Sequence, residues 1–196
     1  MGIFSAFEEK PTDIHFASQE KDENIIFVMR RDFITNIPWI FFGLIFAIAP
    51  FIYMSYVVRN GSIAYFLPSG LEQIFLLVWI LISFAYIIES FLKWYYNIYI
   101  VTDQRVIDVD FNPLFYKKIS ETTYDRIEDS SFTINGLFAT IFNYGDVFIQ
   151  TAGGDREFDF LQVPNPSVVQ DKISDLAAAE KKSVTRVIEQ AQKLKK

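Results

Sequence analysis

The stretch ISFAYIIESFLKWYYNIYIVTDQRVIDV, residues 82 to 109, changes character twice without a linker. It begins as an apolar run suited to lipid, acquires Glu89 and Lys93, and then becomes aromatic and β-branched, which is typical of a β-strand. A polar turn from Thr102 to Arg105 follows, and the alternating residues after it indicate a second strand. The sequence therefore joins a membrane-type helix directly to β-structure.

Two apolar segments are long enough to cross a bilayer. Residues 37 to 58 contain no charge, and residues 71 to 92 contain only Glu72 and Glu89. A helix needs about 20 apolar residues to span a hydrocarbon core about 30 Å thick. We therefore predict a two-helix transmembrane hairpin over residues 33 to 93, with its turn at residues 59 to 70.

Basic residues flank this hairpin on one side. Arg30 and Arg31 precede the first segment and Lys93 follows the second, whereas the turn contains only Arg59. Short loops rich in Lys and Arg remain on the cytoplasmic side of a membrane. We expect a multi-pass protein of the cytoplasmic membrane with two helices and with both termini in the cytoplasm.

Small residues indicate how the two helices pack. Gly43 and Ala47 form a small-xxx-small pair in the first segment, and Ser83 and Ala85 offer small residues in the second. Such residues allow a neighbouring helix to approach closely, either within the hairpin or between two copies of the chain. Pro50 predicts a kink in the first helix.

The residues that carry most enzyme chemistry are missing. His15 is the only histidine and the chain has no cysteine, so the sequence predicts no zinc site and no His-based triad. Glu89 lies four residues before Lys93, the favourable order for an ion pair on a helix, and no second buried charge makes a proton relay. We expect no enzyme activity, no cofactor, no metal and no small-molecule substrate.

The C-terminal half has the pattern of a small α+β domain. Several strand-like segments run to residue 164, and Asn165 with Pro166 then predicts the start of an amphipathic helix. This order favours a small barrel or sandwich of antiparallel strands over residues 94 to 180, closed by a C-terminal helix. Residues 1 to 32 are expected to form a cytoplasmic leader and a juxtamembrane segment, whose apolar run at residues 25 to 29 fits a strand or a helix.

Four stretches together resemble a known family. They are QEKDENIIFVMRR at residues 19 to 31, YIVTDQRVI at 99 to 107, YDRIEDSSF at 124 to 132 and NYGDVFIQT at 143 to 151. Their order around the two-helix hairpin, from about Glu20 to Asp175, resembles bacterial membrane proteins with a pleckstrin-homology (PH) domain of the second bacterial type, formerly a domain of unknown function.

The resemblance implies a PH-like fold of about seven strands in two antiparallel sheets with a C-terminal helix, at the inner face of the cytoplasmic membrane. It implies no common catalytic residues. Phosphoinositide-binding relatives place several basic residues around the first strand-turn-strand. The corresponding turn here, Thr102 to Arg105, contains one basic residue beside a carboxylate, so inositol phosphate recognition is not expected.

Charge is divided unevenly along the chain. Residues 94 to 180 contain fourteen acidic and six basic residues, whereas the tail at residues 181 to 196 contains six basic residues and Glu189. The favoured hypothesis is a non-enzymatic, membrane-anchored scaffold or adaptor that binds a protein partner or self-assembles, without nucleic acid. The alternative is a reader of lipid headgroups at the membrane surface, through the candidate contacts Arg30, Arg31, Lys93, Lys181, Lys182, Arg186 and Lys193.

Overall fold

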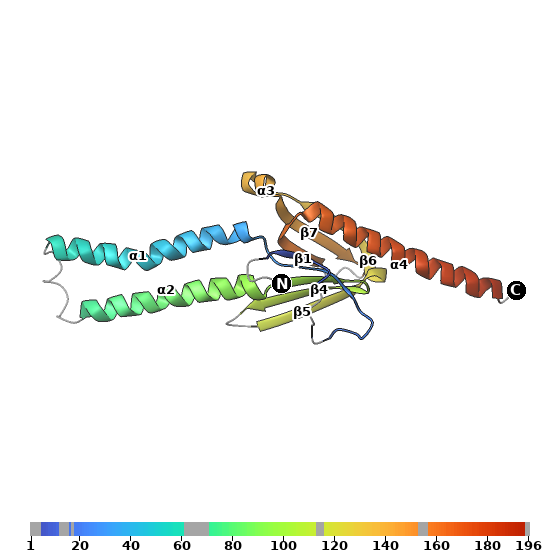
Figure 1. Ribbon diagram of the computed structural model, residues 1–196, viewed down its shortest axis with the longest axis horizontal. Helices are drawn as coiled ribbons and strands as arrows, with labels where there is room; N and C mark the ends of the chain where they lie inside the picture. The colour runs from blue at the N-terminus through green and yellow to red at the C-terminus, as the bar shows by residue number, and fades with distance from the viewer. Residues whose placement is uncertain are drawn as a thin grey trace. The chain divides into compact units, whose positions relative to one another are not determined.

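The computed structural model describes residues 5–11, 16, 18–60, 71–112, 116–152 and 157–194, which fall into two units (Figure 1). The first unit, named here the β-domain, combines the residues up to Thr35 with those from Tyr95 onward. The second unit, named here the hairpin, is Asn36–Trp94. His15 and residues 61 to 70 of the expected turn lie outside the described residues.

In the described residues the β-domain contains two antiparallel sheets, ordered β1-β2-β3-β4-β5 and β6-β7-β8. The strands are β1 (Phe7–Glu9), β2 (Ile25–Met29), β3 (Ile98–Thr102), β4 (Arg105–Asn112), β5 (Tyr116–Thr123), β6 (Ile127–Thr133), β7 (Tyr144–Thr151) and β8 (Glu157–Pro164). The helices are α3 (Leu137–Phe142) and α4 (Pro166–Leu194), with short 3-10 turns at Phe33–Asn36 and Tyr124–Arg126.

The two sheets and α4 share one core. In β7 the inward-facing Val147 and Ile149 are fully buried, as the two-residue period of a strand requires. The Tyr99 ring lies 4.5 Å from the Phe160 ring, so β3 of one sheet packs on β8 of the other. Ile173 on α4 is also fully buried in this cluster. This arrangement is the expected sandwich closed by a C-terminal helix.

The leader is part of the sheet, which differs from the expected domain boundaries. The segment whose conformation the sequence left open is β2, and it pairs with β3 through Met29 opposite Tyr99. Val28 and Met29 are almost fully buried. The β-domain therefore includes residues on both sides of the hairpin, because the partner strand of β2 lies about 70 residues further along the chain.

The hairpin consists of α1 (Ile37–Asn60) and α2 (Leu71–Tyr96). A Cβ atom added at Gly43 would lie 3.2 Å from Cγ1 of Ile87, so the glycine serves helix packing within the chain. Ser83 is 2% exposed, and its hydroxyl donates to the carbonyl of Trp79. Ala47 is half-buried, whereas Ala85 is exposed within the chain.

Pro50 creates a defect in α1 that α2 repairs. Proline has no backbone N–H, so the Phe46 carbonyl one turn earlier loses its helical donor. The indole Nε1–H of Trp79 donates to this carbonyl at 2.9 Å, and the Trp79 ring lies 4.7 Å from the Phe46 ring. An unsatisfied carbonyl is costly in an apolar environment, and the Trp79 indole satisfies it.

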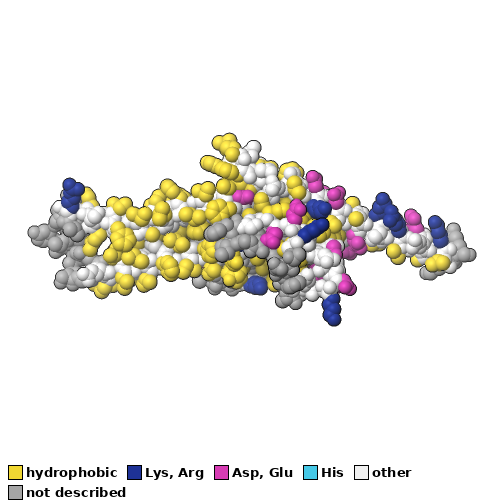
Figure 2. All heavy atoms as spheres, viewed as in Figure 1, with side chains coloured by type: hydrophobic (Ala, Val, Ile, Leu, Met, Phe, Trp, Pro, Cys, Tyr) yellow, Lys and Arg dark blue, Asp and Glu magenta, His cyan; other side chains and the backbone are white. Residues whose placement is uncertain are grey.

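Both long helices are apolar enough to cross a membrane, over Phe33–Tyr56 and Gln73–Tyr96. Only 11% and 6% of their most apolar stretches are buried within the chain. A core helix of a water-soluble protein is mostly buried, and hydrophobic side chains instead cover the visible surface of these helices (Figure 2). Length and composition therefore suit a bilayer.

A double-mutant cycle tests the repair at Pro50. The Trp79→Phe substitution should destabilise the hairpin by about 0.5 to 1.5 kcal/mol more with Pro50 present than in a Pro50→Ala background, where the backbone N–H of the substituted residue restores the donor to Phe46. Reversible SDS unfolding of the full chain in mixed micelles measures this difference.

Trp39→Phe is the matched control, because the Trp39 indole donates to Asn36 and not to the Phe46 carbonyl. Its cost should be the same in both backgrounds. Equal costs of Trp79→Phe in both backgrounds would show that the indole does not compensate for the proline.

Candidate interaction surfaces

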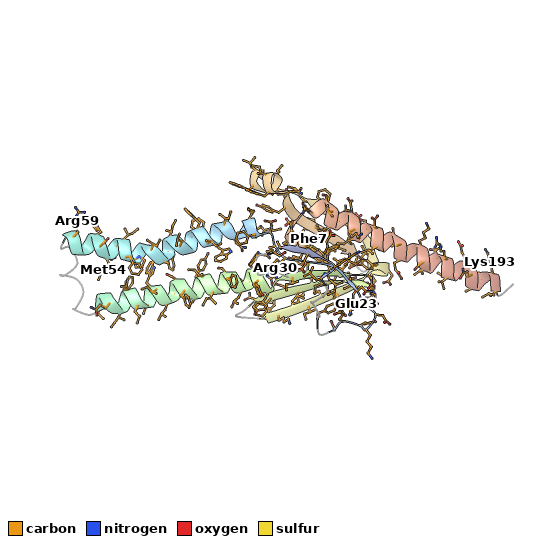
Figure 3. All side chains as sticks on the ribbon, viewed as in Figure 1. Phe7, Glu23, Arg30, Met54, Arg59 and Lys193 are labelled. Carbon is orange, nitrogen blue, oxygen red and sulfur yellow. The ribbon has the colours of Figure 1, made fainter. Side chains whose placement is uncertain are left out.

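A buried ion pair lies at the β3–β4 turn, where inositol phosphate recognition was not expected. The Glu23 side chain is fully buried, and Arg105 contacts it through Nε and Nη2, each at 2.9 Å (Glu23 is labelled in Figure 3). The Thr102 hydroxyl also donates to Glu23 at 2.8 Å. These contacts fasten the leader to the β3–β4 turn, and the three residues are named here the clamp.

The clamp uses the whole guanidinium of Arg105. Its Nη1 contacts Glu121 at 3.0 Å, and its Nη2 donates to the Ser18 carbonyl at 2.6 Å. Burial would raise the pKa of Glu23, but hydrogen bonds from Arg105, the Glu20 N–H and Thr102 outweigh it and the pKa is lowered. Because the one cation of the turn is paired with the carboxylates of Glu23 and Glu121, the turn offers no uncommitted positive charge to a phosphate.

The basic residues beside the hairpin differ from expectation. Arg30 is 3% exposed and its guanidinium lies 4.8 Å from the centre of the Tyr95 ring, so it is a buried cation–π partner and not a surface cation. Arg31 is half-buried. Lys93 forms the predicted ion pair with Glu89 at 2.6 Å and is 44% exposed, so this pairing is confirmed.

A carboxylate with a raised pKa lies on β4, next to the edge strand β5. Burial raises the pKa of Asp108 to about 6 and Asp110 adds to the effect, while Lys118 and Arg31 act in the opposite direction. Asp159 raises it further. The group of charges joins β4, β5, β8 and the juxtamembrane residue Arg31.

The basic tail continues α4 without a break. Ile173 and Ala177 are its last buried residues, and every residue from 178 to 194 is exposed. This exposed half of α4 is named here the arm, and Lys193 lies near its end (Figure 3). The other cations expected there, Lys181, Lys182 and Arg186, are also exposed.

One face of the arm is apolar and uncovered. Its exposed apolar side chains are Val184 (44%), Val187 (64%), Ile188 (53%) and Leu194 (89%). At about 100° per residue, they lie on the side of α4 that carries the buried Val169, Ile173 and Ala177 in the core. The core face of α4 therefore continues along the arm with nothing packed on it among the described residues.

Two further features of the β-domain are exposed. Strand β5 pairs only with β4 in the described structure, and its first four residues, Tyr116, Lys117, Lys118 and Ile119, are all exposed. Lysines on an edge strand oppose pairing with other chains. The short helix α3 carries four exposed large apolar side chains, at Leu137, Phe138, Ile141 and Phe142.

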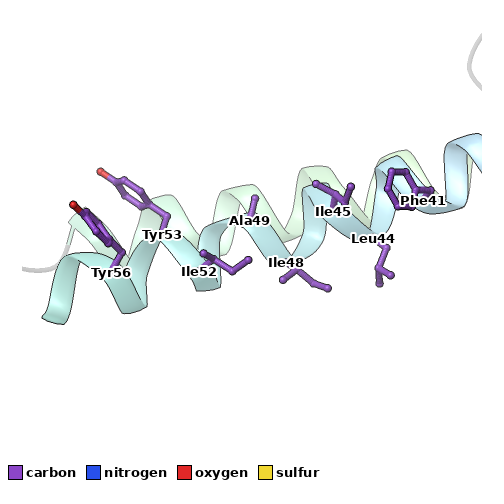
Figure 4. Close-up of a pocket in the computed structure, with 8 residues that line it drawn as sticks. All are labelled: Phe41, Leu44, Ile45, Ile48, Ala49, Ile52, Tyr53 and Tyr56. Atoms are coloured by element: carbon purple, nitrogen blue, oxygen red, sulfur yellow. The ribbon is translucent and has the colours of Figure 1, made fainter.

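Two hollows in the surface of the described residues differ in their lining. An open groove of about 540 Å³ follows α1 and is lined by apolar and tyrosine side chains between residues 41 and 56 (Figure 4). A smaller hollow of about 220 Å³ between β6 and β7 includes Asp129 and Gln150 but no cation. Among the described residues, no group of three or more His, Cys, Asp or Glu could hold a metal ion.

Two antiparallel sheets that share a core with a C-terminal helix define a PH-like domain. The sequence profile of the bacterial PH domain family matches residues 24–177, and the chain belongs to this family. One similar solved structure is a DUF1696 family protein with a pleckstrin-homology domain from Shewanella loihica PV-4. It has 13% identity and a TM-score of 0.35, over 41% of this chain and 70% of that one. Comparison with curated proteins finds no match.

The extent of the family match agrees with the structure. It begins at Asn24, directly before β2, and so includes the hairpin between β2 and β3. It ends at Ala177, which is also the last core residue of α4. The expected resemblance is confirmed, and the arm lies beyond the matched residues.

Removing only the cation of the clamp should lower the stability of the protein more than removing the cation when the Glu23 carboxylate has already been neutralised. Arg105→Ala leaves the buried Glu23 carboxylate without its cation, at a cost of about 3 to 5 kcal/mol. In a Glu23→Gln background the same substitution should cost less, because no buried charge remains. Urea unfolding of the full chain in mild detergent micelles measures both, and Arg126→Ala on an exposed turn is a control expected within about 0.5 kcal/mol of wild type. Equal costs in the two backgrounds would contradict a buried clamp.

Asp108 should make stability depend on pH. The pKa of Asp108 is higher in the folded protein than in the unfolded chain. The stability that this difference contributes is therefore fully present below the ordinary pKa of 3.8 and is lost as the pH rises through about 6. Between pH 4 and pH 7, the free energy of unfolding of Asp108→Asn should therefore rise by about 1 to 2 kcal/mol relative to that of the wild type. This value is reduced because Asp108 is partly exposed to solvent. Urea titrations at both pH values test this. Ser120→Ala, opposite Asp108 on β5, should give a pH-independent difference. The same pH-independence for Asp108→Asn would refute the assignment.

Proposed function

We propose that the chain is a non-enzymatic scaffold or adaptor, anchored in the cytoplasmic membrane by the hairpin, whose arm binds a protein helix. That helix belongs to a partner or to a second copy of the chain. The observation that carries the proposal is the uncovered apolar face of the arm, formed by Val184, Val187, Ile188 and Leu194.

The arm gains stability from a partner. An isolated helix of about 12 to 15 residues is marginal in water, and the arm has no tertiary contacts among the described residues. Burying one large aliphatic side chain contributes about 1.5 to 3 kcal/mol. Val184, Val187, Ala191 and Leu194 are spaced by three, four and three residues, which is the spacing of a seam between two paired helices.

The positions of Lys182, Arg186 and Lys193 favour a protein over a lipid surface, whereas Lys181 lies about 60° from Val184, at one edge of the apolar face. Lys182, Arg186 and Lys193 lie about 160° to 200° around the helix from Val184, on the face opposite the apolar one. A helix lying on a membrane keeps its cations within reach of the headgroups beside its apolar face. Here Ser183 and Gln190 flank one side of that face, so pairing with another helix brings no like charges together there.

Sheet pairing supports the proposed topology. Because β2 and β3 pair within one sheet, the two ends of the hairpin must emerge on the same side of any membrane that the hairpin crosses. Two crossings meet this requirement, and the basic residues Arg31 and Lys93 favour the cytoplasmic side. The β-domain and the arm would then face the cytoplasm.

Native mass spectrometry of the full chain, purified from its own membranes in mild detergent, tests this function. The wild type should carry a stoichiometric second copy or a foreign subunit. Val184→Gln with Val187→Gln, on the apolar face, should weaken that association by at least tenfold. Lys182→Gln with Arg186→Gln, on the opposite face, should leave it unchanged.

Other outcomes would reject the arm as a protein-binding site. A monomer that retains only anionic lipid, or an association lost in the Lys182 and Arg186 variant alone, would point to the lipid reader. A label on the arm of the full chain in anionic and in neutral proteoliposomes would then report whether the arm contacts lipid. For the lipid reader, the contact should occur with anionic vesicles and should be lost at high salt.

A further inference from the structure

We propose that α3 inserts its apolar side chains into the acyl-chain boundary of the membrane that the hairpin crosses, as a third membrane contact of the chain. The inference rests on the proposed membrane anchoring but uses a different part of the β-domain from the arm. Its occupant is the lipid bilayer and not a protein.

The chemistry of α3 suits lipid. Within six residues it exposes Leu137 (73%), Phe138 (67%), Ile141 (64%) and Phe142 (47%). No charged residue occurs between Phe132 and Asp146. Hydrophobic side chains cover the surface over α3 (Figure 2). Exposed large apolar groups at this density mark a binding surface, and the missing charges mean that entry into an apolar layer requires no desolvation of an ion.

The backbone holds α3 out from the sheet on a narrow, fixed base. The helix begins after Gly136, whose φ is 97°, and ends at Asn143, whose φ is 54°. Below it the strands are close together, since a Cβ at Gly145 would clash with the Thr133 carbonyl oxygen. Because both ends turn sharply, the exposed side chains project as a preformed knob and their insertion requires little further ordering.

Hydrogen bonds tie the base of α3 to the start of α4. The Asn165 N–H donates to the Asn143 carbonyl at 2.9 Å, and the Asn143 amide donates to the Asn165 side chain at 2.7 Å. Three residues before Asn165, the Gln162 carbonyl accepts the N–H of Asp32 at 2.7 Å. Three strand residues span about 10 Å, so α3 and Asp32 lie at the same end of the β-domain.

That end is where the chain leaves for the hairpin. The β-domain stops at Thr35, three residues after Asp32, and the chain returns to it at Tyr95. A domain whose connections to the membrane lie at one end presents that end to the bilayer. The apolar knob is therefore at the end of the β-domain to which both connections to the hairpin run. The absence of charge on α3 favours lipid over a partner that is recognised through charge complementarity.

The absence of cysteine from the chain allows a clean spin-label test. Single-cysteine variants of the full chain are labelled and reconstituted in liposomes of phosphatidylethanolamine and phosphatidylglycerol. Collision rates with oxygen, which enters lipid, and with a neutral nickel chelate, which stays in water, are measured by power saturation. The test position is Phe138→Cys on α3. The control is Glu128→Cys, an exposed position on β6 at the end of that strand farther from α3. Ile45→Cys on the exposed surface of α1 reports on the hairpin.

We expect the oxygen-to-nickel ratio at residue 138 to be several-fold higher than at residue 128 and to approach that at residue 45. A water-like ratio at 138 with a lipid-like ratio at 45 would overturn the contact of α3 while leaving the anchoring intact. Protection of 138 from both reagents would show a protein contact and would overturn it as well. A water-like ratio at 45 would instead reject the hairpin anchor, and α3 with it.

Discussion

The pairing of β2 with β3 is the constraint on which the rest of the structure depends. Met29 lies opposite Tyr99, so two strands that are neighbours in the sheet are separated by the whole hairpin in the sequence. A chain that leaves at the end of one strand must return to the start of the next. Two antiparallel helices of similar length achieve this return, whereas a single long helix would not.

The same constraint explains the abrupt junction between helix and strand. Only Asn97 separates α2 from β3, and its side-chain oxygen accepts the N–H of Phe111 on the neighbouring strand. The short connection adds little loop-closure entropy to the pairing of β3 with β2. The family match across residues 24–177 spans this junction.

Local patterns predicted those parts of the fold that local forces determine. Unbroken apolar runs indicated both long helices, alternation around the turn at Thr102 indicated β3 and β4, and Asn165 with Pro166 marked the start of α4. The pairing of β2, the clamp at Glu23 and the burial of Arg30 were missed because their partners lie far along the chain. A lone arginine or glutamate in a polar leader has the same appearance whether it is solvated or buried.

The two uncovered apolar surfaces of the β-domain are distinguished by the charges near them. On the arm, Lys182, Arg186 and Lys193 oppose the apolar face, so one side of the helix suits water and the other would suit the proposed second helix. Around α3 no charged residue occurs from Thr133 to Gly145, so entry of the knob into lipid would not require the desolvation of an ion. The amphipathic surface suits a protein partner in the cytoplasm, and the uncharged one suits the bilayer. A domain held at the membrane by the hairpin and by α3 would leave its arm as the segment available for recruitment.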